Sequence, residues 1–137
     1  MNKFLIIMMS LWAINGWAEA DPSGLWNTFD KAGVLQSTVE VRVQEGKLYA
    51  TVVSIHTGTE KNPLCEKCEG DLKDKPVIGM EVINGLTLKK NIWEKGKVFD
   101  PETGGACKGR VWLEDGMLMV RGYVGFVYQT KAWRRAL

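Results

Sequence analysis

The chain has 137 residues, a formal net charge of +2 at pH 7, and 45% hydrophobic and 25% charged residues. A charge this small, without a basic run, does not argue for nucleic acid or an anionic membrane as a partner. The chain is apolar enough to fold, and its length is that of a single domain.

The first twenty residues have the layout of a secretory signal peptide. A short, positively charged start, Met1-Asn2-Lys3, leads into an apolar run over residues 4–14, and Ala18-Glu19-Ala20 matches the A-x-A cleavage pattern. The run of about 11 residues is too short for a membrane-spanning helix. We therefore expect residues 1–20 to be removed and residues 21–137 to form one domain. The mature chain is expected to be periplasmic or secreted, with no transmembrane segment.

Hydrophobic residues alternate with a period of two along the rest of the chain, which predicts antiparallel strands. A first strand is expected near residues 24–29, and the alternation is cleanest over residues 37–44. Glu45-Gly46 separates this strand from residues 47–55, and a two-residue turn there sets the register of a hairpin. One face of the hairpin is then wholly apolar, as in a sheet that buries one side. Its apolar pairs are Val39 with Val52, Val41 with Ala50 and Val43 with Leu48.

Turn residues recur in the second half of the chain. Asn84-Gly85, Lys95-Gly96 and Asp115-Gly116 are each a candidate hairpin turn. Asp115-Gly116 is a strong hairpin signal, and pairing its flanks gives an apolar face. That register joins Val111 to Val120 and Leu113 to Leu118.

Further strands are expected near residues 77–83 and 126–135. The polar stretch 56–75 and the turn cluster 100–106 lie between strands. The total of about eight or nine short strands, with no convincing amphipathic helix, predicts an all-β fold. Short strands at even spacing are typical of a sandwich or a closed barrel.

The polar stretch contains a Cys-x-x-Cys at Cys65 and Cys68. Haem attachment is excluded because Glu69, and not a histidine, follows the second cysteine. A thioredoxin-like dithiol is disfavoured because it needs a βαβ context. An exported chain meets an oxidising environment, so we expect a local disulfide between the two residues. The alternative is a zinc site in which Cys65 and Cys68 join Cys107 and His56.

The remaining chemistry does not amount to a catalytic set. Cys107 is expected to be a small buried hydrophobic side chain, with a reactive thiol or an alternative pairing as the other interpretations. His56 is the one histidine, and the chain has neither a Gly-x-Ser-x-Gly elbow nor a glycine-rich phosphate loop. We therefore predict no catalytic residue, no cofactor and no metal, and we rank an enzyme last among the possible functions.

One cluster is a candidate binding site. The register of the Asp115-Gly116 hairpin places Arg110 opposite Arg121, and directly opposed like charges destabilise a sheet. Two guanidinium groups with aromatic side chains beside them can receive a carboxylate or sulfate headgroup. The alternative is an exposed face whose arginines extend into water or reach nearby acids. The predicted set is Arg110, Trp112, Arg121 and Tyr123.

The beginning and the end of the expected domain resemble lipocalins and their calycin relatives. Gly24-x-Trp26 on the first strand is similar to their opening motif, and Trp133-Arg134-Arg135 stands where a basic residue of the last strand is expected. The resemblance implies that Trp26 closes one end of a barrel beneath Arg135. An aromatic face under a guanidinium group forms a cation–π contact suited to that role.

A longer series of motifs resembles one family of small exported bacterial proteins catalogued as a domain of unknown function. The resemblance implies an antiparallel up-and-down barrel of about eight strands, lipocalin-like, over residues 21–137. Cys107 departs from the family pattern, which has an aromatic there. The motifs, in order, are Gly24-Leu-Trp-Asn27, the Cys-x-x-Cys loop, Lys75-Pro-Val-Ile-Gly-Met80, Gly85-Leu86, Trp93-Glu-x-Gly96, Phe99-Asp-Pro101, Trp112-Leu-Glu-Asp-Gly116, Val120-Arg-Gly-Tyr123 and Trp133-x-Arg135.

Two functions follow from such a fold. The first is the binding of a small apolar or amphipathic ligand, which can be anionic, in the cup of the barrel. The second is an interaction module of the cell envelope, in which side chains fill the barrel and its rim or loops contact a protein partner. An open cavity of several hundred Å³ distinguishes the first from the second.

Overall fold

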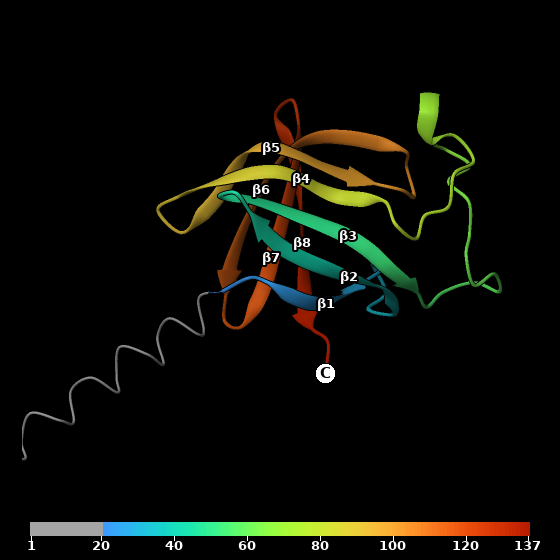
Figure 1. Cartoon of the computed structure of the whole chain (residues 1–137), viewed down its shortest axis with the longest axis horizontal. Helices are drawn as coiled ribbons and strands as arrows, with labels where there is room; N and C mark the ends of the chain where they lie inside the picture. The colour runs from blue at the N-terminus through green and yellow to red at the C-terminus, as the bar shows by residue number, and fades with distance from the viewer. Residues whose placement is uncertain (1–20) are drawn as a thin grey trace, which may run out of the picture.

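The computed structural model describes residues 21–137, and the predicted signal peptide lies outside the described residues. Eight antiparallel strands follow one another around a closed barrel, and β8 returns to pair with β1 (Figure 1). This confirms the predicted all-β, up-and-down architecture. The strands are β1 (Gly24–Phe29), β2 (Leu35–Gln44), β3 (Lys47–Ile55), β4 (Glu81–Lys89), β5 (Ile92–Asp100), β6 (Gly105–Glu114), β7 (Met117–Val124) and β8 (Val127–Arg135).

Two of the predicted hairpins have the expected register. β2 and β3 pair as the apolar alternation requires, and β6 and β7 pair Val111 with Val120 and Arg110 with Arg121. Both residues of each turn, Glu45-Gly46 and Asp115-Gly116, have positive φ angles. This is the backbone of a type I′ turn, whose twist matches that of the flanking strands.

The predictions of the other two hairpin turns were wrong. Asn84-Gly85 lies inside β4, and Lys95-Gly96 lies inside β5. At each position the register against the neighbouring strand shifts, with one extra residue on β4 or β5. Gly85 has φ +75° and Lys95 has φ +62°. Bulges and tight turns both need residues that adopt positive φ, so the same residue types serve both. The actual turn between β4 and β5 is Lys90-Asn91.

The interior is filled at one end of the barrel, which we call the closed end. Large inward side chains gather there, next to the β2–β3, β4–β5 and β6–β7 turns, and they are almost completely shielded from solvent. Burying side chains of this size contributes roughly 1.5–3 kcal/mol each to the free energy of folding. They include Trp26, Leu48, Leu86, Trp93 and Leu118.

The barrel is sealed where β1 meets β8, by Trp26 and Arg135, the two residues to which the resemblance to lipocalins assigns this role. Trp26 pairs with Arg135 across this seam, and the Arg135 guanidinium lies 4.4 Å from the centre of the Trp26 ring. The Trp26 Nε1–H donates to the Pro22 carbonyl at 2.8 Å, and Arg135 donates to the Ser23 carbonyl at 2.9 Å. A Cβ at Gly24 would approach Arg135 to 3.2 Å, which explains a glycine two residues before the tryptophan.

The segment that leads into the seam is fixed by Asp21. Its carboxylate accepts hydrogen bonds from the Ser23 N–H at 2.9 Å and the Ser23 hydroxyl at 2.8 Å. These bonds, and to a lesser extent the charge of Arg135, lower the pKa of Asp21. A carboxyl group whose pKa is lowered by folding stabilises the fold at pH values above its pKa in the unfolded chain, which is about 3.9. This stabilisation is lost as the pH falls through the pKa of the folded state.

The long connection between β3 and β4 leaves the barrel and contains a short 3-10 helix, η2 (Gly70–Leu72). Figure 1 shows this connection as the green segment beside the open end of the barrel. In the described part of the chain, no helix has the length and hydrophobicity needed to cross a bilayer.

Replacing Arg135 by alanine is expected to lower the free energy of unfolding by about 1–2 kcal/mol, through loss of the cation–π contact and the hydrogen bonds to the N-terminal segment. Arg134→Ala is the matched control, because Arg134 is an exposed neighbour whose guanidinium lies 5.7 Å from the Phe29 ring centre. Its effect should stay within about 0.5 kcal/mol. Urea denaturation measures both, and equal losses would contradict a special role for Arg135.

Candidate ligand-binding cavity

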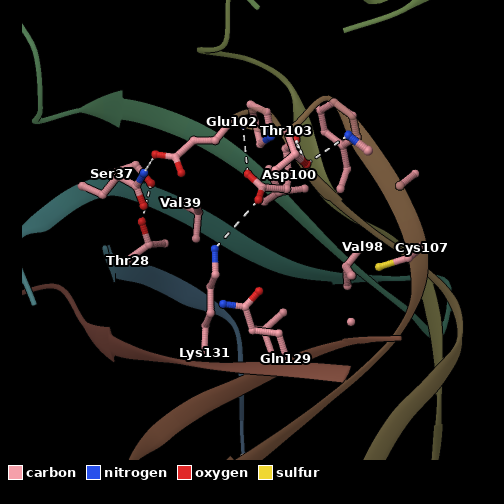
Figure 2. Close-up of a pocket in the computed structure, with 18 of the residues that line it drawn as sticks. Thr28, Ser37, Val39, Val98, Asp100, Glu102, Thr103, Cys107, Gln129 and Lys131 are labelled. Carbon is pink, nitrogen blue, oxygen red and sulfur yellow. Dashed lines mark hydrogen bonds and ion pairs between the residues drawn. The ribbon is translucent and has the colours of Figure 1, made fainter. Parts of the chain in front are cut away.

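A cavity of about 410 Å³ occupies the other half of the barrel and opens at its end (Figure 2). Its mouth is formed by the β5–β6 turn, by residues that flank the β1–β2 and β7–β8 turns, and by Val77 near the end of the β3–β4 connection. Pockets that hold small molecules have volumes of roughly 300–1,000 Å³, so this one is in range. Most of its wall is apolar. The apolar lining includes Val39, Val52, Val82, Val98, Val120 and Trp133.

The cavity exists because inward side chains in the open half are small. Valine, serine, threonine and glycine take many of the inward positions there, in contrast to the tryptophans and leucines of the closed end. On the β6–β7 side, a Cβ at Gly122 would come within 2.8 Å of the Cys107 sulfur. The interior of an eight-stranded barrel can be filled by its own side chains or can hold one small ligand. In this half the side chains are too small to fill the interior, so a cavity remains.

Among residues 21–137, Lys131 is the only cationic residue in the cavity wall. It belongs to β8, where it pairs with the inward-facing Val120, and Figure 2 shows its side chain extending into the cavity toward Asp100. The Lys131 Nζ lies 3.9 Å from Asp100 Oδ2, and 42% of the lysine side chain is exposed. At that distance and exposure the ion pair is weak, so the ammonium group remains available to another anion.

Other polar groups form a partial ring around the mouth. Asp100 accepts a hydrogen bond from the backbone N–H of Glu102 at 2.9 Å, and the Gln36 side-chain amide donates to the Glu102 carboxylate. On β1 and β2, the Thr28 and Ser37 hydroxyls are 2.6 Å apart and both residues are buried. These two hydroxyls satisfy each other, which allows them to line a largely apolar space.

Cys107 is a free thiol in the wall of the cavity. It is half-buried, pairs with Val98 across β5 and β6, and points inward, as Figure 2 shows. The predicted role as a small hydrophobic side chain therefore fits in part, since the side chain packs like one but borders an open space. The sequence pattern did not indicate that this residue would face a cavity.

The structure joins Cys65 and Cys68 in a disulfide, with 5.4 Å between their Cα atoms. The two thiols are therefore not available to zinc, and His56 instead lies 2.8 Å from the Thr38 hydroxyl. Among residues 21–137, no group of three or more histidine, cysteine, aspartate or glutamate side chains is placed to hold a metal ion.

The disulfide lies against the β5–β6 turn that carries the mouth carboxylates. Cys65 and Cys68 are each 2% exposed and pack with Met80, Val77 and Phe99. The Cys65 sulfur is 3.4 Å from the Pro101 carbonyl oxygen. Gly104, at φ +76°, approaches Lys67 so closely that a Cβ would overlap the Lys67 carbonyl. The disulfide thus fixes one side of the mouth.

The four residues predicted to bind an anion are brought together on the outer surface of the barrel, outside the cavity. The Arg121 guanidinium lies 4.9 Å from the Trp112 ring centre and 4.3 Å from that of Tyr128, and it donates to the Thr130 hydroxyl at 2.7 Å. Arg110 lies 5.7 Å from the Tyr123 ring centre and 3.7 Å from a Glu94 oxygen. The cluster is assembled, and its binding of an anion stays a prediction.

Sequence reasoning did not select Lys131 or Asp100 as cavity residues. The signal for Lys131 was available, because a residue two positions before an inward-facing tryptophan on the same strand also faces inward. Asp100 was assigned to a solvated turn, and its approach to Lys131 depends on how distant strands curve around the barrel. No local pattern encodes that approach.

The fold and the cavity together define a lipocalin-like barrel: eight antiparallel strands closed at one end and open at the other. A solved structure described as "Protein HP1028 from the human pathogen Helicobacter pylori belongs to the lipocalin family" is similar to this fold, with a TM-score of 0.72 and 20% sequence identity over 85% of this chain and 84% of that chain. Residues 24–135 match the family described as "Uncharacterized protein conserved in bacteria (DUF2147)". The protein belongs to this family, which agrees with the resemblance of its motifs. No curated protein matches the sequence.

Removing the disulfide by a Cys65→Ser/Cys68→Ser double substitution is expected to lower the free energy of unfolding by about 2 kcal/mol or less, because the closed loop is short. The barrel should keep its far-ultraviolet circular dichroism spectrum. Amide exchange in residues 100–104 should become faster, since the turn loses a fixed neighbour. Cys107→Ser is the control and should leave that exchange unchanged. Unaltered exchange in the double variant would contradict the role assigned to the disulfide.

Proposed function

We propose that the barrel binds one small amphipathic molecule, with its apolar part deep in the cavity and an anionic group at Lys131. The observation that carries this proposal is an open, mainly apolar cavity of about 410 Å³, to whose wall the described part of the chain contributes a single cationic residue. An apolar chain gains roughly 0.8 kcal/mol for each methylene group removed from water. The polar contacts would then fix the orientation of the ligand.

The distribution of polar groups supports that orientation. The deeper wall contains valines and Trp133, whereas Asp100 and Glu102 stand at the mouth. A ligand anion would share Lys131 with Asp100, so a headgroup of low charge fits better than a polyanion such as a phosphate ester. A monocarboxylate with a medium-length alkyl chain satisfies both the apolar depth and the single ammonium group.

The second candidate function, an interaction module, was based on a barrel filled by its own side chains. The open cavity favours ligand binding over that alternative. The exported location is likewise part of the proposal. It is supported by the layout of residues 1–20 and by a disulfide of the kind that persists in oxidising compartments.

Dodecanoate is a suitable probe, with dodecanol as its uncharged counterpart. Lys131→Met should weaken dodecanoate binding by about 10- to 100-fold, because a hydrogen bond to a charged group contributes about 1.5–3 kcal/mol. Dodecanol binding should change little, since methionine keeps the apolar stem. Isothermal titration calorimetry measures both ligands. Lys89→Met, at an exposed site near the closed end, is the matched control and should bind like the wild type.

Filling the mouth tests the cavity itself. Gly105 lines the mouth, and a Cβ there would meet nothing closer than the Thr103 hydroxyl at 3.5 Å. Gly105→Trp should therefore fold normally and abolish binding of both dodecanoate and dodecanol. Lys108→Trp, on the outer face, is the control and should keep binding. If Gly105→Trp bound either ligand as the wild type does, or if the wild type bound neither, the proposal would be wrong.

A further inference from the structure

The turn between β7 and β8 exposes a concentrated apolar tip. Phe126 is fully exposed, and Val124 and Val127 are each 72% exposed. In Figure 1 this hairpin end projects from the top of the barrel, away from the β3–β4 connection. Single exposed hydrophobic residues are common, but three on one projecting turn are typical of a contact surface.

Aromatic residues lie directly behind the tip on the outer surface. Tyr123 pairs with Tyr128 across the hairpin, and their ring centres are 5.8 Å apart. Tyrosine combines an apolar ring with a polar hydroxyl, which suits it to the headgroup region between water and hydrocarbon.

Four cations lie behind the tyrosines, also on the outer surface. Lys97 pairs with Lys108 across β5 and β6, and Arg110 pairs with Arg121 across β6 and β7. Only Arg110 has a carboxylate within salt-bridge distance, Glu94; in residues 21–137, Lys97, Lys108 and Arg121 form no salt bridge. Two opposed pairs of like charge are unfavourable in an isolated sheet. An external anionic surface would attract these cations and offset the repulsion between them.

We propose that this hairpin docks the barrel onto an anionic phospholipid bilayer. The groups follow the order of a membrane interface: the apolar tip enters the acyl boundary, the two tyrosines lie among the headgroups, and the cations reach the lipid phosphates. The small net charge of the whole chain does not conflict with this, because local clustering sets the surface potential that a membrane meets.

Docking in this way would place the cavity at the bilayer surface. Val124 and Val127 line the cavity as well as forming the tip, so the inserted turn is one lip of the mouth. An amphipathic molecule could then pass between lipid and barrel with little exposure of its apolar part to water. The docking itself rests on the outer surface alone and does not require that the cavity be occupied.

Vesicle co-sedimentation with residues 21–137, which contain every strand of the barrel, tests the proposal. The protein should bind vesicles of mixed phosphatidylglycerol and phosphatidylcholine, and bind much more weakly to phosphatidylcholine alone. Binding should fall steeply toward about 1 M salt, where the screening length is about 3 Å. Phe126→Asp should weaken binding about tenfold or more, because an aromatic ring that would enter the bilayer is replaced by a charge.

Matched variants distinguish the effect of this surface from a general effect of lowering the protein's charge or its exposed apolar area. Lys97→Ala/Lys108→Ala should weaken binding about 30-fold, whereas Lys47→Ala/Lys89→Ala, with the same loss of charge near the closed end, should leave it unchanged. Leu88→Asp, at an exposed residue of the closed end, is the control for Phe126→Asp.

Equal losses in the two lysine pairs, or no loss in Phe126→Asp, would overturn the proposal. An absence of vesicle binding would also overturn the proposal. If the protein instead dimerised in a Phe126-dependent way, the tip would be a contact surface for a second copy of the chain. Dodecanoate binding measured on the same samples keeps the outcomes distinct, since docking can fail while the cavity still binds its ligand.

Discussion

The seam between β1 and β8 is the constraint on which the rest of the structure depends. Only two residue pairs join these strands, Trp26 with Arg135 and Asn27 with Arg134, and yet they convert a sheet with two free edges into a closed barrel. The Trp26 ring is buried in the interior beside the seam, and the exposed Arg135 guanidinium lies over that ring at the closed end. Because the plug and the seam share these residues, closing the barrel also closes one of its ends.

A barrel sealed at one end assigns different roles to its two halves. The closed half contains the large side chains and supplies most of the core, whereas the open half contains small inward residues and so retains a cavity. At the mouth, the disulfide packs against the β5–β6 turn and holds it in place. Stability and binding can thus be altered separately, because they depend on residues at opposite ends.

The outer surface also has a feature that is unfavourable in the isolated protein. Two pairs of cations lie opposite each other on β5, β6 and β7, on the same side of the barrel as the exposed apolar turn that forms one lip of the cavity. An unfavourable arrangement in the isolated molecule is most easily understood as complementary to something outside it.

The sequence predicted those parts of the fold that depend on local rules. The β2–β3 and β6–β7 registers follow from alternation and from turn residues that adopt positive φ, and both are correct. Asn84-Gly85 and Lys95-Gly96 were misinterpreted because a bulge needs the same backbone angles as a turn. The cluster around Arg121 was found through register, but alternation does not say which face of a strand will point outward. The sequence left open whether the barrel contains a cavity or is filled, because this depends on the sizes of inward residues from all the strands together.

The central claim is that the cavity holds a small molecule, and native mass spectrometry of the protein purified from bacterial cells that express the full chain tests it most directly. We predict a fraction of protein heavier than the polypeptide by the mass of one small molecule, released when the protein is denatured and recovered as an amphipathic anion. A spectrum with the polypeptide mass alone, under conditions that preserve known non-covalent complexes, would contradict the claim.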